Sequence, residues 1–190
     1  EKNALFTLEK AISKYVMYLG DDDYLDENYL VQVLRITRDN KKLTCIIPSI
    51  VPITPEKERL EGGRDIDIES RLFTKGFYST KENSYRGHQL SGLTFLREGL
   101  LEEYKKQKVQ NIYPFIFFTA YSTLIGETYH FTDYPIKVTQ PGQDKKDWGY
   151  GKDGLMNEIF DNYKKLPVTY LQKTLLELKH YRMQDWRLWM

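Results

Sequence analysis

Three consecutive carboxylates, Asp21, Asp22 and Asp23, are the residues of this 190-residue chain whose type and spacing most suggest chemistry. They follow Gly20, at the end of an apolar run over residues 15–19 that is typical of a buried strand. Adjacent carboxylates repel one another unless a cation neutralises them, and Mg²⁺ and Mn²⁺ prefer oxygen ligands of this kind. Open α/β sheets bind their ligands at the carboxyl ends of strands. We therefore predict that the three aspartates hold Mn²⁺ or Mg²⁺, which could in turn bind a diphosphate.

The same carboxylates also suit the start of a helix. Acidic side chains accept hydrogen bonds from the free N–H groups of a first helical turn, and they interact favourably with its dipole. Asp23 or Asp26 could cap a helix that begins at Glu27. On spacing alone, a metal site and a helix cap are about equally supported.

The elements that would position these acids lie in the first part of the chain, residues 1–54. Apolar spacing predicts helices near residues 5–12 and 27–38, the second with Leu30, Val33 and Leu34 on one face. Apolar runs at 15–19 and 43–51 predict two strands. Alternation of helix and strand is typical of an α/β fold, and we expect a βαβ-type unit with a parallel sheet.

The remainder of the chain divides into three further parts. Residues 55–85 are rich in charge and contain two adjacent glycines, so we expect an exposed loop there. Residues 86–152 predict a second α/β part, with helices at 98–108 and 112–125 and a short strand at 135–139. A strand is the alternative at 112–125. The aromatic side chains of 112–125 are expected in the core. Residues 153–190 predict two helices, at 155–165 and 168–181, separated by Pro167.

Composition excludes some classes of function. The chain has 28 Lys and Arg against 27 Asp and Glu, a net charge of +1, which argues against a nucleic acid partner. Cys45 is the only cysteine, so the chain cannot form an internal disulfide, and we expect a cytoplasmic protein. No apolar run reaches the roughly 20 residues that span a bilayer. The basic, Trp-bearing segment at 170–190 suits either packing against the fold or peripheral contact with the inner face of a membrane.

The acidic segment also resembles a known family. The run YVMYLGDDDYL at residues 15–25, together with NAL at 3–5, KAI at 10–12 and YL at 29–30, resembles the family 2 glycosyltransferases and their Asp-rich "DXD" signature. The run LSGLTFLRE at 90–98 resembles the segment that begins the acceptor-side half of these enzymes. The resemblance implies the nucleotide-sugar-binding GT-A fold, with a mostly helical C-terminal part. Only twenty residues precede Asp21, so we expect this chain to be a C-terminal portion that lacks the N-terminal nucleoside-binding segment.

The resemblance implies transfer of a sugar from a UDP- or GDP-linked donor to a saccharide or lipid-linked acceptor, in the synthesis of a bacterial surface polysaccharide. The metal would stabilise the negative charge that builds on the leaving diphosphate. Residues expected to contact substrates are Asn3, Asp22, His88, Ser91, Gly92 and Trp148. Trp148 stands among glycines and offers a flat apolar face for a sugar ring, with packing as its alternative role.

A catalytic base is harder to identify. Inverting members of the family use a carboxylate to deprotonate the acceptor hydroxyl, and their Glu-Asp pair would fall near Tyr113 and Pro114, where this chain has no acid. Asp133 and Asp147 are the candidates we retain as catalytic residues, with Asp144 and Glu127 as further acids in the same part of the chain. Two other functions stay open. One is a metal-dependent phosphotransferase or nucleotidyltransferase, and the other is a non-catalytic saccharide-binding fragment.

Overall fold

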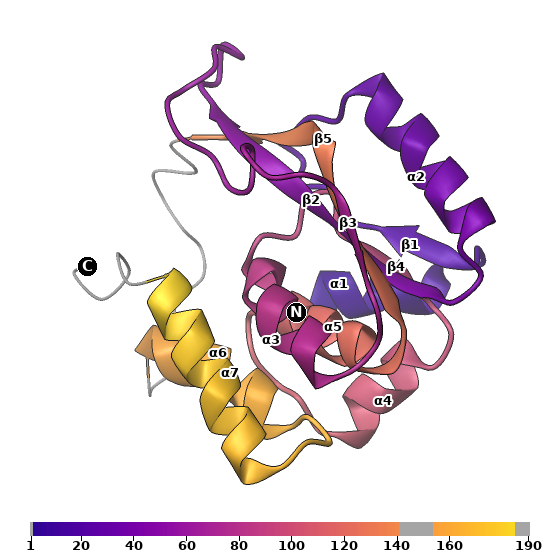
Figure 1. The fold of residues 1–190 in the computed structure, drawn as a ribbon, viewed down its shortest axis with the longest axis vertical. Coiled ribbons are helices and arrows are strands. Elements are labelled where there is room, and N and C mark those ends of the chain that lie inside the picture. Colours follow the sequence, from indigo (N-terminus) through magenta and orange to yellow (C-terminus); the bar gives the residue numbers. More distant parts are fainter. Residues whose placement is uncertain (1, 141–153, 185–190) are drawn as a thin grey trace.

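The structure is a computed structural model that describes residues 2–140 and 154–184. A five-stranded sheet forms its centre, in the order β1-β4-β2-β5-β3 (Figure 1). The two long central strands are β2 (Leu43–Ile53) and β5 (Glu127–Thr139). Three short strands complete the sheet, namely β1 (Tyr15–Met17), β3 (Arg71–Phe73) and β4 (Thr94–Leu96). The fold class is therefore α/β, as the alternation of helix and strand predicts.

The sheet is mixed, however, and the expectation of a parallel sheet is wrong. Among the strands of the described residues, only β2 and β5 pair in parallel, whereas β1 with β4, β4 with β2, and β5 with β3 are antiparallel. Strand β4 lies between β1 and β2, so the first two strands run in the same direction without bonding to each other. The short strand expected at 135–139 is the end of the longer β5.

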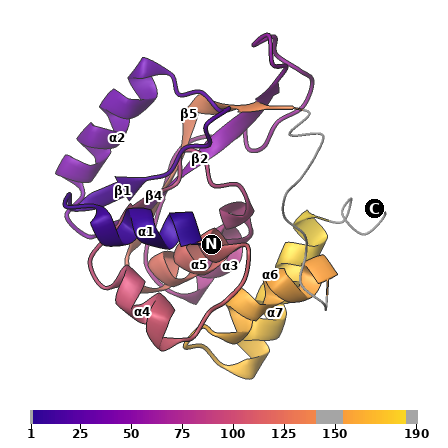
Figure 2. The same cartoon turned by 180° about the vertical axis from the view of Figure 1, so that it is seen from behind.

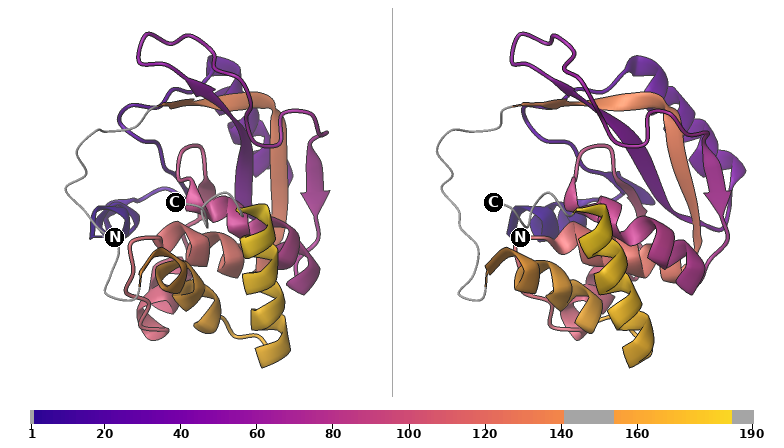
Figure 3. Two further views of the ribbon diagram at one scale, coloured as in Figure 1. Left: turned by 90° about the vertical axis from the view of Figure 1, so that its left-hand side faces the viewer. Right: turned by 60° about the vertical axis from the view of Figure 1, so that its left-hand side comes forward.

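Helix α2 (Glu27–Asp39) covers one face of the sheet (Figure 3). Its buried side chains are Tyr29 and Val33, which belong to a core cluster with Ile46 of β2 and Phe131 of β5. The aromatic rings of Tyr29 and Phe131 stack with their centroids 5.4 Å apart. The helix lies where the apolar spacing predicted it, but its contact face is rotated, because Leu30 and Leu34 are exposed.

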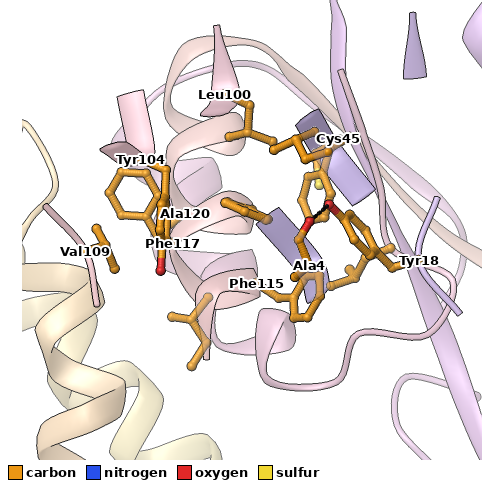
Figure 4. Packing of buried hydrophobic residues seen from close by; sticks show 14 of the residues in the cluster. Ala4, Tyr18, Cys45, Leu100, Tyr104, Val109, Phe115, Phe117 and Ala120 are labelled. Carbon is orange, nitrogen blue, oxygen red and sulfur yellow. Dashed lines mark hydrogen bonds between the residues drawn. The ribbon is translucent and has the colours of Figure 1, made fainter. Parts of the chain in front are cut away.

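The other face carries the larger core, built around helix α5 (Pro114–Ile125). Helices α1 (Lys2–Lys10), α3 (Phe77–Asn83) and α4 (Leu100–Lys106) lie on this same side (Figure 2). The helix expected at 112–125 is thus confirmed, and most of its side chains are buried. Figure 4 shows its aromatic side chains packed with Tyr18, Cys45 and the first turn of α1.

Two C-terminal helices, α6 (Gly154–Lys164) and α7 (Tyr170–Met183), extend this helical side beside α3. Their expected bounds are confirmed to within two residues. A buried hydrogen bond joins the hydroxyl of Tyr163 to Nδ1 of His180, 2.7 Å apart. Helix α7 begins with a capping box, in which Thr169 and Gln172 bond to each other's backbone N–H groups.

The segment 55–85 is not simply an exposed loop. It contains a turn over residues 54–58, strand β3 and helix α3. Between the turn and β3, the backbone of Arg64 is hydrogen-bonded to the backbone of Ile50 in β2. Three side chains of α3, Ser79, Thr80 and Asn83, are buried. Two of its carboxylates pair with groups elsewhere in the chain, Asp65 with Arg86 and Glu82 with Lys179, whereas residues 55–63 are exposed as expected.

Candidate functional site

The acidic segment lies at the carboxyl end of β1, beside the turn at residues 90–93. Beyond β1 the chain stays bonded to that turn, through Tyr18 N–H to the carbonyl of Leu93 at 3.0 Å and Gly92 N–H to the carbonyl of Tyr18 at 2.8 Å. The N–H of Gly20 then donates to Oγ of Ser91 at 2.9 Å. The structure therefore brings together the acidic segment and the segment at 90–98, both of which carry the resemblance to family 2 glycosyltransferases.

Asp23 is buried and has a structural role. The residue is 9% exposed, and its Oδ1 accepts a hydrogen bond from the N–H of Thr139 at 3.0 Å. Its Oδ2 accepts a second hydrogen bond from Oγ of Ser91. Burial raises the pKa of Asp23, and these two hydrogen bonds oppose the rise. The carboxylate thus ties the end of β1 to the Ser91 turn and to the end of β5.

Asp21 and Asp22 are exposed, in contrast to Asp23. A Cβ atom added at Gly20 would lie 3.2 Å from Oδ1 of Asp22 and 2.9 Å from Oδ2 of Asp23. The carboxylates of Asp22 and Asp23 therefore converge over Gly20, and the missing side chain leaves them room. The main-chain carbonyl of Asp22 accepts a hydrogen bond from the hydroxyl of Thr139, which fixes the segment against β5.

Gly92 shapes the turn that faces these acids. Its φ of +81° belongs to the left-handed region, and an added Cβ would lie 2.5 Å from Cγ1 of Ile136. The hydroxyl of Tyr29 in α2 donates to the carbonyl of Gly92 at 2.7 Å. A glycine is needed here both for conformation and for close approach. The contacts of Ser91 and Gly92 that the structure shows are contacts within the protein, and their predicted contact with substrate stays a prediction.

The helix cap belongs to Asp26. Its Oδ1 accepts a hydrogen bond from the N–H of Asn28 at 2.8 Å, at the start of α2. The alternative role considered for Asp23 therefore falls to Asp26, and Asp21 and Asp22 are not needed for the cap.

The fit of a divalent ion rests on Asp21 and Asp22. Within residues 2–140 and 154–184, no group of three or more His, Cys, Asp and Glu side chains is arranged to hold a metal ion. Both oxygens of Asp23 already accept hydrogen bonds from the protein, so metal binding by Asp23 would compete with them. The two exposed carboxylates offer the oxygen donors that Mg²⁺ and Mn²⁺ take, with further ligands left to substrate and water.

The other predicted residues lie in different places. Asn3 is exposed in the first turn of α1, next to Ala4, whose carbonyl accepts from the Tyr18 hydroxyl at 2.9 Å, so it stands close to the end of β1 (Figure 4). His88 ends the 3₁₀ helix η1 (Ser84–His88), with Nδ1 3.0 Å from Nε2 of Gln184. Asp144, Asp147 and Trp148 lie outside the described residues.

The candidate bases on β5 do not meet the acidic segment directly. Asp133 is exposed and accepts a hydrogen bond from Oγ of Ser70 at 3.1 Å. Thr139, which contacts Asp23, follows six residues later on the same strand. Glu127 stands at the opposite end of β5, paired with Leu43.

The start of α5 lies near the end of β1, because the rings of Tyr18 and Phe115 are 4.7 Å apart. Tyr113 and Pro114 occupy that helix start, and neither side chain can act as a carboxylate base.

A buried ion pair was missed by the sequence analysis. Arg86 in η1 bonds to Asp65 through Nε at 2.6 Å and Nη2 at 2.9 Å. Nε2 of His130 in β5 lies 3.2 Å from the same carboxylate. Arg64 donates to the carbonyls of Arg86 and Pro48, each at 3.0 Å. No local pattern marks these residues, because they come from three distant segments.

Electrostatics explains why this pair is charged in the interior. Burial alone would raise the pKa of Asp65, but its contacts with His130 and Arg86 outweigh burial and hold the pKa far below its usual range. Burial lowers the pKa of His130 by more than Asp65 raises it, so the ring is mostly neutral near pH 7. Arg86 is therefore the partner of Asp65 that stays positively charged at neutral pH. Burial also lowers the pKa of Arg64 to about 10, which leaves it charged at neutral pH.

Comparison with known proteins shows similarity at the level of the fold. No protein-family model and no curated protein matches the sequence. Among solved structures, residues 1–349 of TarS from S. aureus, a wall teichoic acid glycosyltransferase, match with a TM-score of 0.59 and 14% identity. The match covers 97% of this chain and 52% of that one, so this chain spans about half the length of the TarS structure. The fold is therefore similar to that of a glycosyltransferase.

The helices give one further result about membranes. Among the described residues, none forms a helix with the length and hydropathy needed to cross a bilayer. This agrees with the absence of a long apolar run in the sequence.

Proposed function

We propose that this chain is part of a glycosyltransferase that takes a sugar from a nucleoside diphosphate donor. The observation that carries the proposal is the pair of exposed carboxylates, Asp21 and Asp22, at the end of β1 in a fold similar to that of a glycosyltransferase. Open α/β folds bind ligands at such strand ends. The resemblance of residues 15–25 and 90–98 to family 2 glycosyltransferases, and with it the GT-A fold, supports the same proposal.

Each residue of the site has a proposed role. Asp21 and Asp22 would hold Mn²⁺ or Mg²⁺ together with oxygens of the donor diphosphate. The ion, when bound, supplies positive charge against the leaving diphosphate. Asp23 and Ser91 position the segment through their buried hydrogen bond. Lys57 brings a positive charge to the same edge, with Nζ 4.4 Å from the ring centroid of Tyr24.

The acceptor and the base are proposed on the resemblance. We propose a saccharide or lipid-linked acceptor of a bacterial surface polysaccharide, with Asn3, His88 and Trp148 among the residues that contact substrates. Asp133 and Asp147 are the proposed bases. We also propose a cytoplasmic location, with peripheral contact at the inner membrane face through the segment at 170–190.

One observation favours a second candidate, a saccharide-binding module without catalysis. The helix start at Tyr113 and Pro114 lies beside the end of β1 and carries no carboxylate. A binding module would bind a sugar or a sugar nucleotide and release no nucleoside diphosphate from it.

The test is a turnover assay with a panel of UDP-glucose, UDP-N-acetylglucosamine and GDP-mannose in Mn²⁺. Release of nucleoside diphosphate is expected. It should be lost in Asp22→Asn and kept in the matched control Asp67→Asn, because Asp67 is also an exposed aspartate but lies outside the acidic segment. Turnover of ATP or another triphosphate in place of the sugar nucleotides would contradict the proposal and favour a phosphotransferase or nucleotidyltransferase. Binding without release would favour the module.

A further inference from the structure

A cavity of about 230 Å³ opens between strand β3, helix α3 and η1, and none of the three aspartates lines it. At about 30 Å³ per water molecule it holds the volume of roughly seven or eight waters. It is smaller than the roughly 300–1,000 Å³ of sites for drug-sized ligands. Its volume therefore suits a ligand of about one sugar ring.

The floor of this cavity is rigid and polar. Arg86 and His130 line it, and their side chains are 8% and 2% exposed. The bidentate bond to Asp65 fixes the guanidinium of Arg86, and β5 fixes the position of His130. A floor held by a buried ion pair is formed before any ligand arrives, so binding does not have to order it.

The rim combines aromatic faces with charged side chains. The rings of Phe73 and Tyr78 lie 6.5 Å apart, and the guanidinium of Arg71 lies 4.8 Å from the ring of Phe73. Glu69 and Glu82 add carboxylates to the same lining. Guanidinium groups donate hydrogen bonds and carboxylates accept them, so the rim can form hydrogen bonds with both the acceptors and the donors of a ligand.

The balance of charge narrows the class of ligand. Two carboxylates and two guanidiniums line the cavity; the guanidinium of Arg86 is already paired with Asp65, and the carboxylate of Glu82 is paired with Lys179 at 3.0 Å. Neither an anion nor a cation is favoured by such a lining. An apolar ligand would offer no hydrogen-bonding partner to Glu69 or Arg71 of the rim. A neutral ligand that carries several hydroxyl groups and one apolar ring face matches both the polar groups and the aromatic faces.

We propose that this cavity binds one neutral monosaccharide unit of the acceptor chain. That the unit belongs to an acceptor rests on the proposed function, whereas the binding of a neutral sugar rests on the cavity alone. His130 and Thr139 are nine residues apart on β5, so the cavity lies at most about 30 Å from the acidic segment along the strand. A polymer could occupy both places at once.

The experiment is a titration of ¹⁵N-labelled protein, without metal or nucleotide, followed by backbone amide shifts. The probes are the methyl glycosides of glucose, galactose and N-acetylglucosamine, each to 50 mM, and inorganic phosphate as the anionic probe. At least one glycoside is expected to shift the amides of Phe73 and Tyr78. The variant Tyr78→Ala should weaken this binding about fivefold, because one aromatic face is lost.

Two controls separate the cavity from the rest of the molecule. Tyr78 is 59% exposed, so its replacement should leave the fold intact, and Tyr170→Ala changes a tyrosine of α7 that is 86% exposed and should leave sugar binding unchanged. The variant Asp22→Asn should bind the glycoside with the same affinity as the unchanged protein. Loss of function at the acidic site can therefore be distinguished from loss of sugar binding in the cavity.

Three results would overturn the inference. One is the absence of shifts at Phe73 and Tyr78 with all three glycosides. The second is binding that Tyr78→Ala and Tyr170→Ala weaken equally. The third is a response of the cavity to inorganic phosphate alone, which would make it an anion site.

Discussion

Replacement of Asp23 by alanine should destabilise the protein, whereas the same change at Asp22 should not. The side chain of Asp23 is buried and accepts hydrogen bonds from Ser91 and from the backbone of Thr139. Alanine at position 23 would leave both donors without their partner in a place that water does not reach freely. Asp22 is exposed, and its side chain makes no comparable bond in the described structure.

The size of the effect follows from these contacts. A hydrogen bond to a charged group contributes about 1.5–3 kcal/mol to stability, and two are lost. Burial raises the pKa of Asp23, which means that burying the carboxylate is itself unfavourable, so the lower end of the range applies. The expected loss is therefore about 3 kcal/mol in the free energy of unfolding. At about 2–4 °C per kcal/mol for a chain of this length, Tm should fall by about 6–12 °C.

The assay is thermal unfolding by circular dichroism at neutral pH, without metal, for the unchanged protein, Asp23→Ala and Asp22→Ala. An exposed substitution usually changes stability by at most about 0.5 kcal/mol, so Tm of Asp22→Ala should move by about 2 °C or less. Ser91→Ala serves as a further check, because it removes the donor to Oδ2 and the acceptor of the Gly20 N–H, and leaves the bond from Thr139. Its Tm should also fall clearly below that of Asp22→Ala.

Equal values of Tm for Asp23→Ala and Asp22→Ala would refute this reasoning. Such a result would mean that the buried carboxylate does not hold the strand ends together. The division of the three aspartates into one structural and two binding residues would then have no basis.

Three further predictions concern other parts of the fold. Gly92→Ala should cost at least about 2 kcal/mol more than Gly99→Ala, because both positions have positive φ but an added Cβ meets neighbours only at Gly92; equal urea midpoints would contradict this. The pKa of Asp65 is lowered on folding, so its stabilisation is full above its unfolded pKa of about 3.9 and is lost as pH falls through the folded value. Asp65→Asn should therefore flatten the acid limb of stability against pH, and an unchanged limb would show that the pair with Arg86 contributes nothing. Cys45 is fully buried and burial raises its pKa, so iodoacetamide should modify it only in denaturant, as mass spectrometry can establish.

Most of the helices were predictable because their signals are local, whereas α3 lies in the segment that was expected to be an exposed loop. The aromatic segment at 112–125 and the two segments after 153 have apolar spacing that repeats every turn, and α5, α6 and α7 lie where that spacing indicates. The contact face of α2 was less accurate, because Tyr29 packs on Phe131 of β5, and the sequence around Tyr29 contains no sign of that partner.

The order of the strands could not be predicted from local patterns. Strand β4 begins at Thr94, about fifty residues after β2 begins, and it separates β1 from β2. Alternation of helix and strand describes which elements exist, but hydrogen bonds between distant strands decide which of them pair.

The candidate site was predictable in part. The acidic run and the turn with Ser91 and Gly92 were both selected from sequence, and the structure places them in contact. The distinct role of Asp23 depends on Thr139, more than a hundred residues away. The ion pair of Asp65 with Arg86 was not predicted for the same reason, because in the sequence both residues resemble ordinary surface charges.

The most direct test of the central claim is titration calorimetry of UDP and GDP against this chain, with and without Mn²⁺. At least one of the two nucleotides is expected to bind, and its binding should require Mn²⁺. That binding should be lost in Asp22→Ala, with Tm unchanged, and kept in the control Asp67→Asn. Binding of neither nucleotide, or binding that Asp22→Ala leaves intact, would contradict the claim that the exposed carboxylates at the end of β1 hold a diphosphate through a divalent ion.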